Sequence, residues 1–144
     1  LGFHHFPNPH RALSEFARVL KRGGILGLTD NITAEETKAA DYYNAFEKLR
    51  DPSHYWVGPL VTLKAMLETA GFKTGESREL TKECEFHEWA DRQNVSGPNK
   101  ERLLQMMREI PDALTPFMVP RWADGTMYFT LWEAVIVATC GDAV

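Results

Sequence analysis

Histidines are the side chains of this sequence best suited to move a proton near neutral pH. His4 and His5 stand side by side near the start of the chain, and His54 ends the run Arg-Asp-Pro-Ser-His at residues 50–54. An imidazole in a pocket can take a proton from an oxygen or a carbon acid. Surface placement or bracing of a loop would explain the same residues, and the sequence leaves these readings open. No metal site is expected, because the remaining ligand types have no ligand spacing: His10, His87, Cys84 and Cys140.

A second polar group follows a short apolar run. Asp30 and Asn31 come shortly after residues 25–28, which read Ile-Leu-Gly-Leu. In open α/β sheets, ligands gather at the carboxyl ends of strands. We therefore expect chemistry at both ends of the stretch from His4 to Asp30, although aspartate and asparagine are also common in plain turns.

Aromatic side chains gather in the middle of the chain, and the cluster is Tyr42, Tyr43, Tyr55 and Trp56. Together with the methionines and aromatics of residues 86–122, they suggest a surface that selects a small, partly apolar ligand. Core packing explains most of the same residues, so both interpretations stand.

The elements that would position these residues begin with a helix at residues 9–21. Asn8 suits its N-cap, and Gly23 with Gly24 suits its C-terminal cap. The following strand at 25–28 is apolar on both faces, as a strand covered on both sides should be. Thr33 and Glu36 form a capping-box pattern for a second helix, which Pro52 ends.

The rest of the chain alternates in the same way. We expect a helix at 60–70 ended by Gly71, a strand at 73–80, helices at 86–94 and 98–110, a loop at 111–122, and a long final strand at 127–138. This order predicts one α/β domain without internal repeats.

Composition narrows the class of protein. The chain has 144 residues, a net charge of -4, 44% hydrophobic residues and two cysteines. An acidic chain without a basic patch is not expected to bind nucleic acid or an anionic membrane. No apolar run is long enough to span a membrane and no signal peptide is present, so a cytoplasmic protein with reduced cysteines is expected. Because the chain opens on Leu1 inside folded-looking sequence, we favour a fragment of a longer protein.

The order of several short motifs resembles a known family. Residues 18–24 read RVLKRGG, similar to the RVLKPGG that precedes strand five of class I S-adenosylmethionine-dependent methyltransferases. Residues 67–72, LETAGF, resemble the LLxxAGF before strand six, and residues 129–138 are similar to strand seven. The run at 50–54 resembles one found in a subset of these proteins. The likeness is to the ubiquinone/menaquinone C-methyltransferase-like group (methyltransferase type 11), and to its C-terminal half only.

The resemblance implies an architecture. The fold would be the C-terminal part of a Rossmann-like methyltransferase sheet, with strands in the order 5-7-6 and the last strand antiparallel. Residues 1–144 would be the C-terminal portion of one methyltransferase domain, and 86–122 a helical insertion and lid within it. The family's Gly-rich cofactor loop has no counterpart here, since Gly23 and Gly24 close a helix. Strand five would then have an open edge, covered by a second copy, by a rearranged segment or by a missing N-terminal half.

The resemblance also implies a function, namely methyl transfer from S-adenosylmethionine to a small-molecule acceptor, with this chain forming the acceptor side and inactive alone. The alternative is a non-catalytic α/β binding or dimerisation module that pairs through its open edge. An upstream reading frame with a strand and a GxGxG-type loop would favour the enzyme. The residues implied are His4, His5 and His54 in catalysis, Asp30, Asn31, Tyr43, Tyr55 and Trp56 in substrate binding, and Gly2, Phe3 and His4 in cofactor binding, without a metal.

Overall fold

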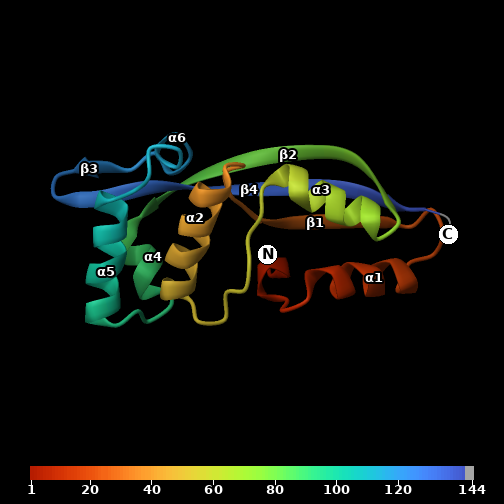
Figure 1. Cartoon of the computed structure of the whole chain (residues 1–144), viewed down its shortest axis with the longest axis horizontal. Coiled ribbons are helices and arrows are strands. Elements are labelled where there is room, and N and C mark those ends of the chain that lie inside the picture. The colour runs from red at the N-terminus through yellow and green to blue at the C-terminus, as the bar shows by residue number, and fades with distance from the viewer. Residues whose placement is uncertain (142–144) are drawn as a thin grey trace.

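The computed structural model describes residues 1–141 as an open antiparallel sheet with helices packed along it (Figure 1). The sheet is four-stranded, with the path β1-β4-β2, and β3 pairs with one end of β4. The elements are the 3-10 helix η1 (Phe3–His5), α1 (Pro9–Val19), β1 (Ile25–Ile32), α2 (Thr37–Arg50), α3 (Leu60–Thr69), β2 (Phe72–Glu85), α4 (Phe86–Asp91), α5 (Gly97–Arg108), α6 (Thr115–Met118), β3 (Arg121–Ala123) and β4 (Thr126–Cys140). The predicted α/β class is therefore confirmed.

Strand β4 carries both hydrophobic cores of the molecule. Met127 and Phe129 pack into the core formed with α2, α4 and α5, whereas Ala134 and Ile136 pack into the core formed with α1 and α3. Alternate residues of a strand point to opposite faces, so these odd- and even-numbered positions use opposite faces of β4. The strand therefore joins the two helical layers into one unit.

The first helix and strand form much as the sequence predicts, with one difference in length. The Asn8 side chain accepts a hydrogen bond from the Arg11 N–H and caps α1 as expected, and Gly23 adopts a φ of 73° after the helix. Strand β1, however, runs on to Ile32, so Asp30 lies inside the strand instead of after it. The prediction of burial on both faces is wrong at its start, where Ile25 is 69% exposed.

The predicted capping box is wrong. Helix α2 begins at Thr37, and its N-cap is Glu36, whose carboxylate accepts from the Ala39 N–H at 2.6 Å. Thr33 stays outside the helix because its own N–H is bonded to the Gly58 carbonyl at 3.2 Å. Its buried hydroxyl has no hydrogen-bond partner among residues 1–141.

Residues 86–122 fold into α4, α5, α6 and β3 and pack beside α2 (Figure 1). The Tyr42 hydroxyl donates to the Met106 carbonyl at 2.8 Å, which ties α2 to α5. The Trp132 indole donates to the Phe117 carbonyl at 2.7 Å, which ties β4 to α6. The role of this segment as a lid stays a prediction. In the described part of the chain, no helix is long and apolar enough to cross a membrane.

Candidate active site

The best-formed polar site joins the start of the chain to strand β1. His4 Nδ1 lies 2.6 Å from Asp30 Oδ1, and the His4 backbone N–H donates to Asp30 Oδ2 at 2.7 Å. The Asn31 N–H donates to the same Oδ1 at 2.8 Å. Asp30 is 3% exposed, so these donors replace the water that a carboxylate would otherwise bind.

The electrostatics of this pair define which atom carries the proton. Burial alone would raise the pKa of Asp30, but the hydrogen bonds and charge of His4, with the Asn31 N–H, outweigh it and lower that pKa. Asp30 is therefore ionised at neutral pH and can only accept, so His4 Nδ1–H donates to it. In the neutral ring this arrangement places the lone pair on His4 Nε2, the form required of a general base.

A second histidine is fastened to the loop after α2. His5 Nδ1 lies 3.0 Å from the Ser53 carbonyl oxygen and 3.1 Å from Ser53 Oγ, and its ring centroid is 4.1 Å from that of His4. Asp51 accepts from the Ser53 hydroxyl and N–H. Burial raises the pKa of Asp51, but these bonds and the nearby His5 lower it further than burial raises it. A charged carboxylate thus orders the turn that holds His5.

The third histidine of the cluster is buried. His54 is 2% exposed, its Nε2 lies 2.9 Å from Asn44 Oδ1, and its ring centroid is 5.7 Å from that of His4. Burial, followed by the charges of His4 and His5, lowers the pKa of His54 from 6.5 to about 4. His54 is therefore a neutral imidazole at neutral pH.

The loop at 51–58 holds the site together through its backbone. The His4 carbonyl accepts from the N–H groups of Tyr55 and Trp56, at 3.0 and 3.1 Å. Trp56 lies directly on Gly58, where a Cβ atom would sit 2.0 Å from the indole ring. The histidine cluster is thus held by contacts with β1, α2 and this loop.

The sequence-predicted residues fall into two groups. His4, His5, His54 and Asp30 come together as described above, while Tyr55 is 54% exposed and Trp56 is partly buried beside them. Tyr43 is fully buried, and its hydroxyl donates to Glu47 Oε1 at 3.1 Å, so it forms part of the core in this structure. Roles in catalysis and substrate binding stay predictions for all of these residues, Asn31 included.

Sequence reasoning missed the polar residues that α2 contributes. Asn44 contacts His54. Glu47 lies buried between Tyr43 and Arg50, and Arg50 Nη1 is 3.8 Å from Glu47 Oε2. Burial raises the pKa of Glu47. The charge of Arg50 and the hydrogen bond from Tyr43 lower that pKa by less, so it stays above its usual value. The available signal was spacing, since Asn44 and Glu47 are three residues apart and lie on adjacent turns of α2.

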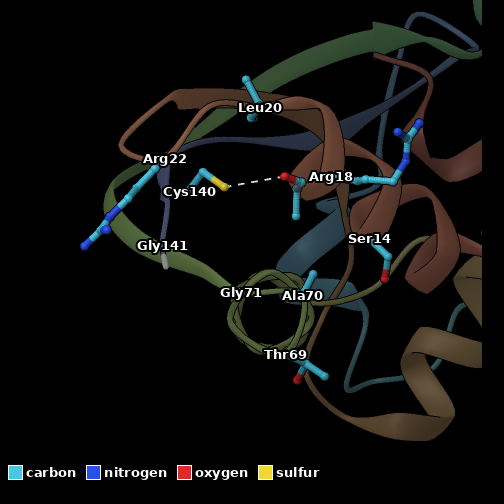
Figure 2. A pocket seen from close by; sticks show the side chains of 10 residues that line it. Ser14, Arg18, Leu20, Arg22, Thr69, Ala70, Gly71, Cys140 and Gly141 are labelled. Carbon is cyan, nitrogen blue, oxygen red and sulfur yellow. Dashed lines mark hydrogen bonds between the residues drawn. The ribbon is translucent and has the colours of Figure 1, made fainter. Parts of the chain in front are cut away.

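One large cavity lies away from the histidines. It has a volume of about 540 Å³ and is lined by the ends of α1, α3 and β4, including Arg18, Thr69 and Cys140 (Figure 2). The Cys140 thiol donates to the Ala17 carbonyl there. This cavity borders the end of the sheet at which β1 begins, and ligands of open α/β sheets bind at carboxyl ends. We therefore place the candidate site at His4 and Asp30.

A second cavity, of about 440 Å³, bears on the cofactor prediction. It follows the outer edge of β1 and is lined by uncharged residues, among them Gly2, Phe3 and Leu28. A Cβ atom at Gly2 would meet nothing within 4 Å. These residues could pack against the flat face of a ring such as adenine, while the polar edge of that ring and the charged groups of S-adenosylmethionine would need other partners. His4 does not line this cavity. Within residues 1–141, no group of three or more His, Cys, Asp or Glu side chains is arranged to hold a metal ion.

Comparison with known proteins identifies the family. The fold defines an open α/β class of protein with a candidate polar site formed by His4 and Asp30 beside β1. Residues 1–28 match the family described as a methyltransferase domain. A Bacillus halodurans C-125 protein provisionally described as a methyltransferase (BH2331) superposes with a TM-score of 0.89 at 35% identity, over 99% of this chain and 67% of that one. The chain therefore belongs to the class I methyltransferase family.

A curated relative and two further structures set the limits of this assignment. The uncharacterized methyltransferase YcgJ of Bacillus subtilis (strain 168) is 25% identical over 109 residues, which are 76% of this chain and 43% of that protein. The chain thus spans less than half of that relative. The YcgJ structure superposes with a TM-score of 0.90 at 21% identity, covering 97% and 61% of the two chains. The cyclase SpnF shares the fold at a TM-score of 0.52 and 18% identity, over 94% of this chain and 46% of that one.

Proposed function

We propose that this chain forms the acceptor side of an S-adenosylmethionine-dependent methyltransferase that acts on a small molecule. The observation that carries the proposal is the His4–Asp30 pair, in which a buried, ionised carboxylate holds both the ring and the backbone of a histidine. Family membership supplies the reaction class, and the pair supplies a base at the carboxyl half of a strand.

The roles follow from the geometry of the pair. Asp30 keeps the proton on His4 Nδ1, so that His4 Nε2 can accept a proton from the acceptor's nucleophilic atom as that atom is methylated. When bound, S-adenosylmethionine supplies the electrophilic methyl group. The contribution of the loop at 51–58 is to fix His4 in space, because much of the catalysis of such a displacement comes from positioning the reactants.

The proposal is tested with a matched pair of variants in the protein that carries this chain together with its cofactor-binding part. Release of S-adenosylhomocysteine is measured with a panel of hydroxyl, amine and carbon-acid acceptors. We expect His4→Gln to lower kcat by about 10²–10⁴-fold, the usual contribution of a general base. His10→Gln changes an exposed histidine on α1 and should leave kcat unchanged. Equal activity of both variants would refute the role of His4.

A second candidate is the non-catalytic module, favoured by the outer edge of β1. Among the described residues, β1 pairs only with β4, and the 440 Å³ groove follows its other side. Such an edge favours pairing with another chain. Titration calorimetry with S-adenosylmethionine, combined with light scattering, separates the two candidates. Cofactor binding supports the enzyme, whereas a stable dimer that does not bind cofactor supports the module.

A further inference from the structure

Asn44 is the polar residue of α2 with the most complete set of hydrogen bonds. Its Nδ2 donates to the carbonyls of Ala40 and Val57, at 2.9 and 2.8 Å. Its Oδ1 accepts from the Val57 N–H at 2.7 Å and lies 2.9 Å from His54 Nε2. The amide cannot flip, because a flipped Asn44 would place its NH₂ group against the Val57 N–H and its oxygen against two carbonyls.

This fixed orientation decides the tautomer of His54. Asn44 Oδ1 can only accept, so His54 Nε2 must carry the proton. The neutral ring then has its lone pair on Nδ1. Within residues 1–141, no hydrogen bond to that nitrogen is formed.

The lone pair belongs to a ring that lies beside the proposed base. The rings of His54 and His4 are 5.7 Å apart with an interplanar angle of 37°, and the His4 carbonyl accepts from the two residues that follow His54. His4 Nε2 likewise has no hydrogen-bond partner in the described chain. Two imidazole acceptors are therefore left without protein donors in one cluster.

We propose that Asn44 is a positioning residue for methyl transfer: it locks His54 in the Nε2–H tautomer, so that Nδ1 accepts a hydrogen bond from an O–H or N–H group of the methyl acceptor. This inference rests on the proposed function. It adds the chemical class of the acceptor, which must carry a hydrogen-bond donor near the atom that is methylated.

The surrounding charges agree with this role. Burial is the first cause that lowers the pKa of His54, to about 4. Any positive charge on His4 or His5 and the charge of Lys48 add to it, and Asp51 opposes it. A neutral His54 keeps its Nδ1 lone pair across the physiological range. An imidazolium would instead repel a donor hydrogen.

The tautomer can be read directly from long-range ¹H–¹⁵N spectra of this chain at pH 7. We expect His54 to show a protonated Nε2 and an unprotonated Nδ1, and to remain so down to about pH 4. A protonated Nδ1 at pH 7 would overturn the proposal without any assay of activity. Added phenol should shift the His54 Nδ1 resonance, and anisole, which has no donor, should not. Equal responses to the two would overturn the acceptor class.

Variants of Asn44 link the tautomer to function. Asn44→Leu removes the acceptor, and we expect a mixture of His54 tautomers and a kcat lowered at least about tenfold, with KM for S-adenosylmethionine unchanged. Asn44→Asp keeps an acceptor oxygen and serves if the leucine variant does not fold. It should keep the Nε2–H tautomer and raise the pKa of His54. Asn99→Ala on the exposed start of α5 is the control and should change neither readout.

The outcomes separate the two proposals. Normal kcat in Asn44→Leu despite mixed tautomers, or an unaltered His54 pKa in Asn44→Asp, would refute positioning by Asn44. Absence of methyl transfer by the wild-type protein, with His54 in the expected tautomer, would instead refute the proposed function and with it the role of Asn44 in that reaction.

Discussion

Replacing Asp30 by asparagine tests whether the buried carboxylate holds His4 in place. The carboxylate accepts from the His4 ring and the Asn31 N–H on Oδ1, and from the His4 N–H on Oδ2. Asparagine has one acceptor oxygen, so at least one buried N–H faces the NH₂ group without an acceptor. An unsatisfied buried donor costs about 1–3 kcal/mol, and the remaining bonds lose their charge assistance. We expect Asp30→Asn to lower the free energy of unfolding by about 2–4 kcal/mol at pH 7.

The pH dependence of that loss has a defined direction. The pKa of Asp30 is lower in the folded state than its usual 3.8, so its ionised form stabilises the fold above pH 3.8, and this contribution is lost as pH falls through the folded pKa. The difference between wild type and Asp30→Asn should therefore stay constant from pH 7 to about pH 5 and shrink below about pH 4. Urea unfolding followed by tryptophan fluorescence at each pH measures it.

The control is Asp41→Asn, which removes the same charge from an exposed position on α2. Its unfolding free energy should change by less than about 0.5 kcal/mol. If Asp30→Asn also lost less than about 0.5 kcal/mol, or if its loss were the same at pH 3 as at pH 7, the carboxylate would not be the anchor described above.

Three further substitutions test the surroundings of the site. In the wild type, unfolded His54 takes up a proton between pH 6.5 and pH 4 that the folded ring does not, so the free energy of unfolding should fall by about 3 kcal/mol over this range. In His54→Gln this fall should disappear, which urea titration at each pH measures. Gly58→Ala should cost about 1–3 kcal/mol and shift the fluorescence of Trp56, because its Cβ would meet that ring at 2.0 Å, while Gly97→Ala has open space and serves as the control. Thr33→Val should be neutral or stabilising in thermal unfolding, because it removes a buried hydroxyl without a partner, and a loss above about 1 kcal/mol would contradict that description.

Local signals predicted the elements, and long-range contacts set where they end. The Asn8 cap and Gly23 define α1 from neighbouring residues alone, so its start was correctly expected. The capping box at Thr33 failed because the Gly58 carbonyl, distant in sequence, binds the Thr33 N–H. Strand β1 extends beyond its apolar run because β4 pairs with it as far as Trp132, which lies opposite Ile32. Pairing of this kind does not appear in the pattern of a single segment.

The candidate site likewise combines features visible in the sequence with contacts between distant residues. The types and approximate places of His4 and Asp30 were evident from the sequence, but their 2.6 Å contact spans 26 residues and depends on the path of the intervening helix. Asn44 was missed, because its spacing from Glu47 on α2 is a weak signal and an asparagine in a helix indicates no function until its partner is known. Its partner, His54, reaches it only because the turn at Asp51 folds the loop back onto α2.

These contacts bear on how one fold can serve different reactions. His4 is held through its ring and N–H by β1, and through its carbonyl by the loop at 51–58. The contacts themselves are polar, but the same loop places Val57 in one hydrophobic core and packs Trp56 against the other. A substitution at Trp56, Val57 or Gly58 would therefore disturb the fold together with the position of His4. The exposed Tyr55 side chain can change without loss of core packing. This chain and the cyclase SpnF share a fold, and a shared fold does not by itself imply a shared reaction.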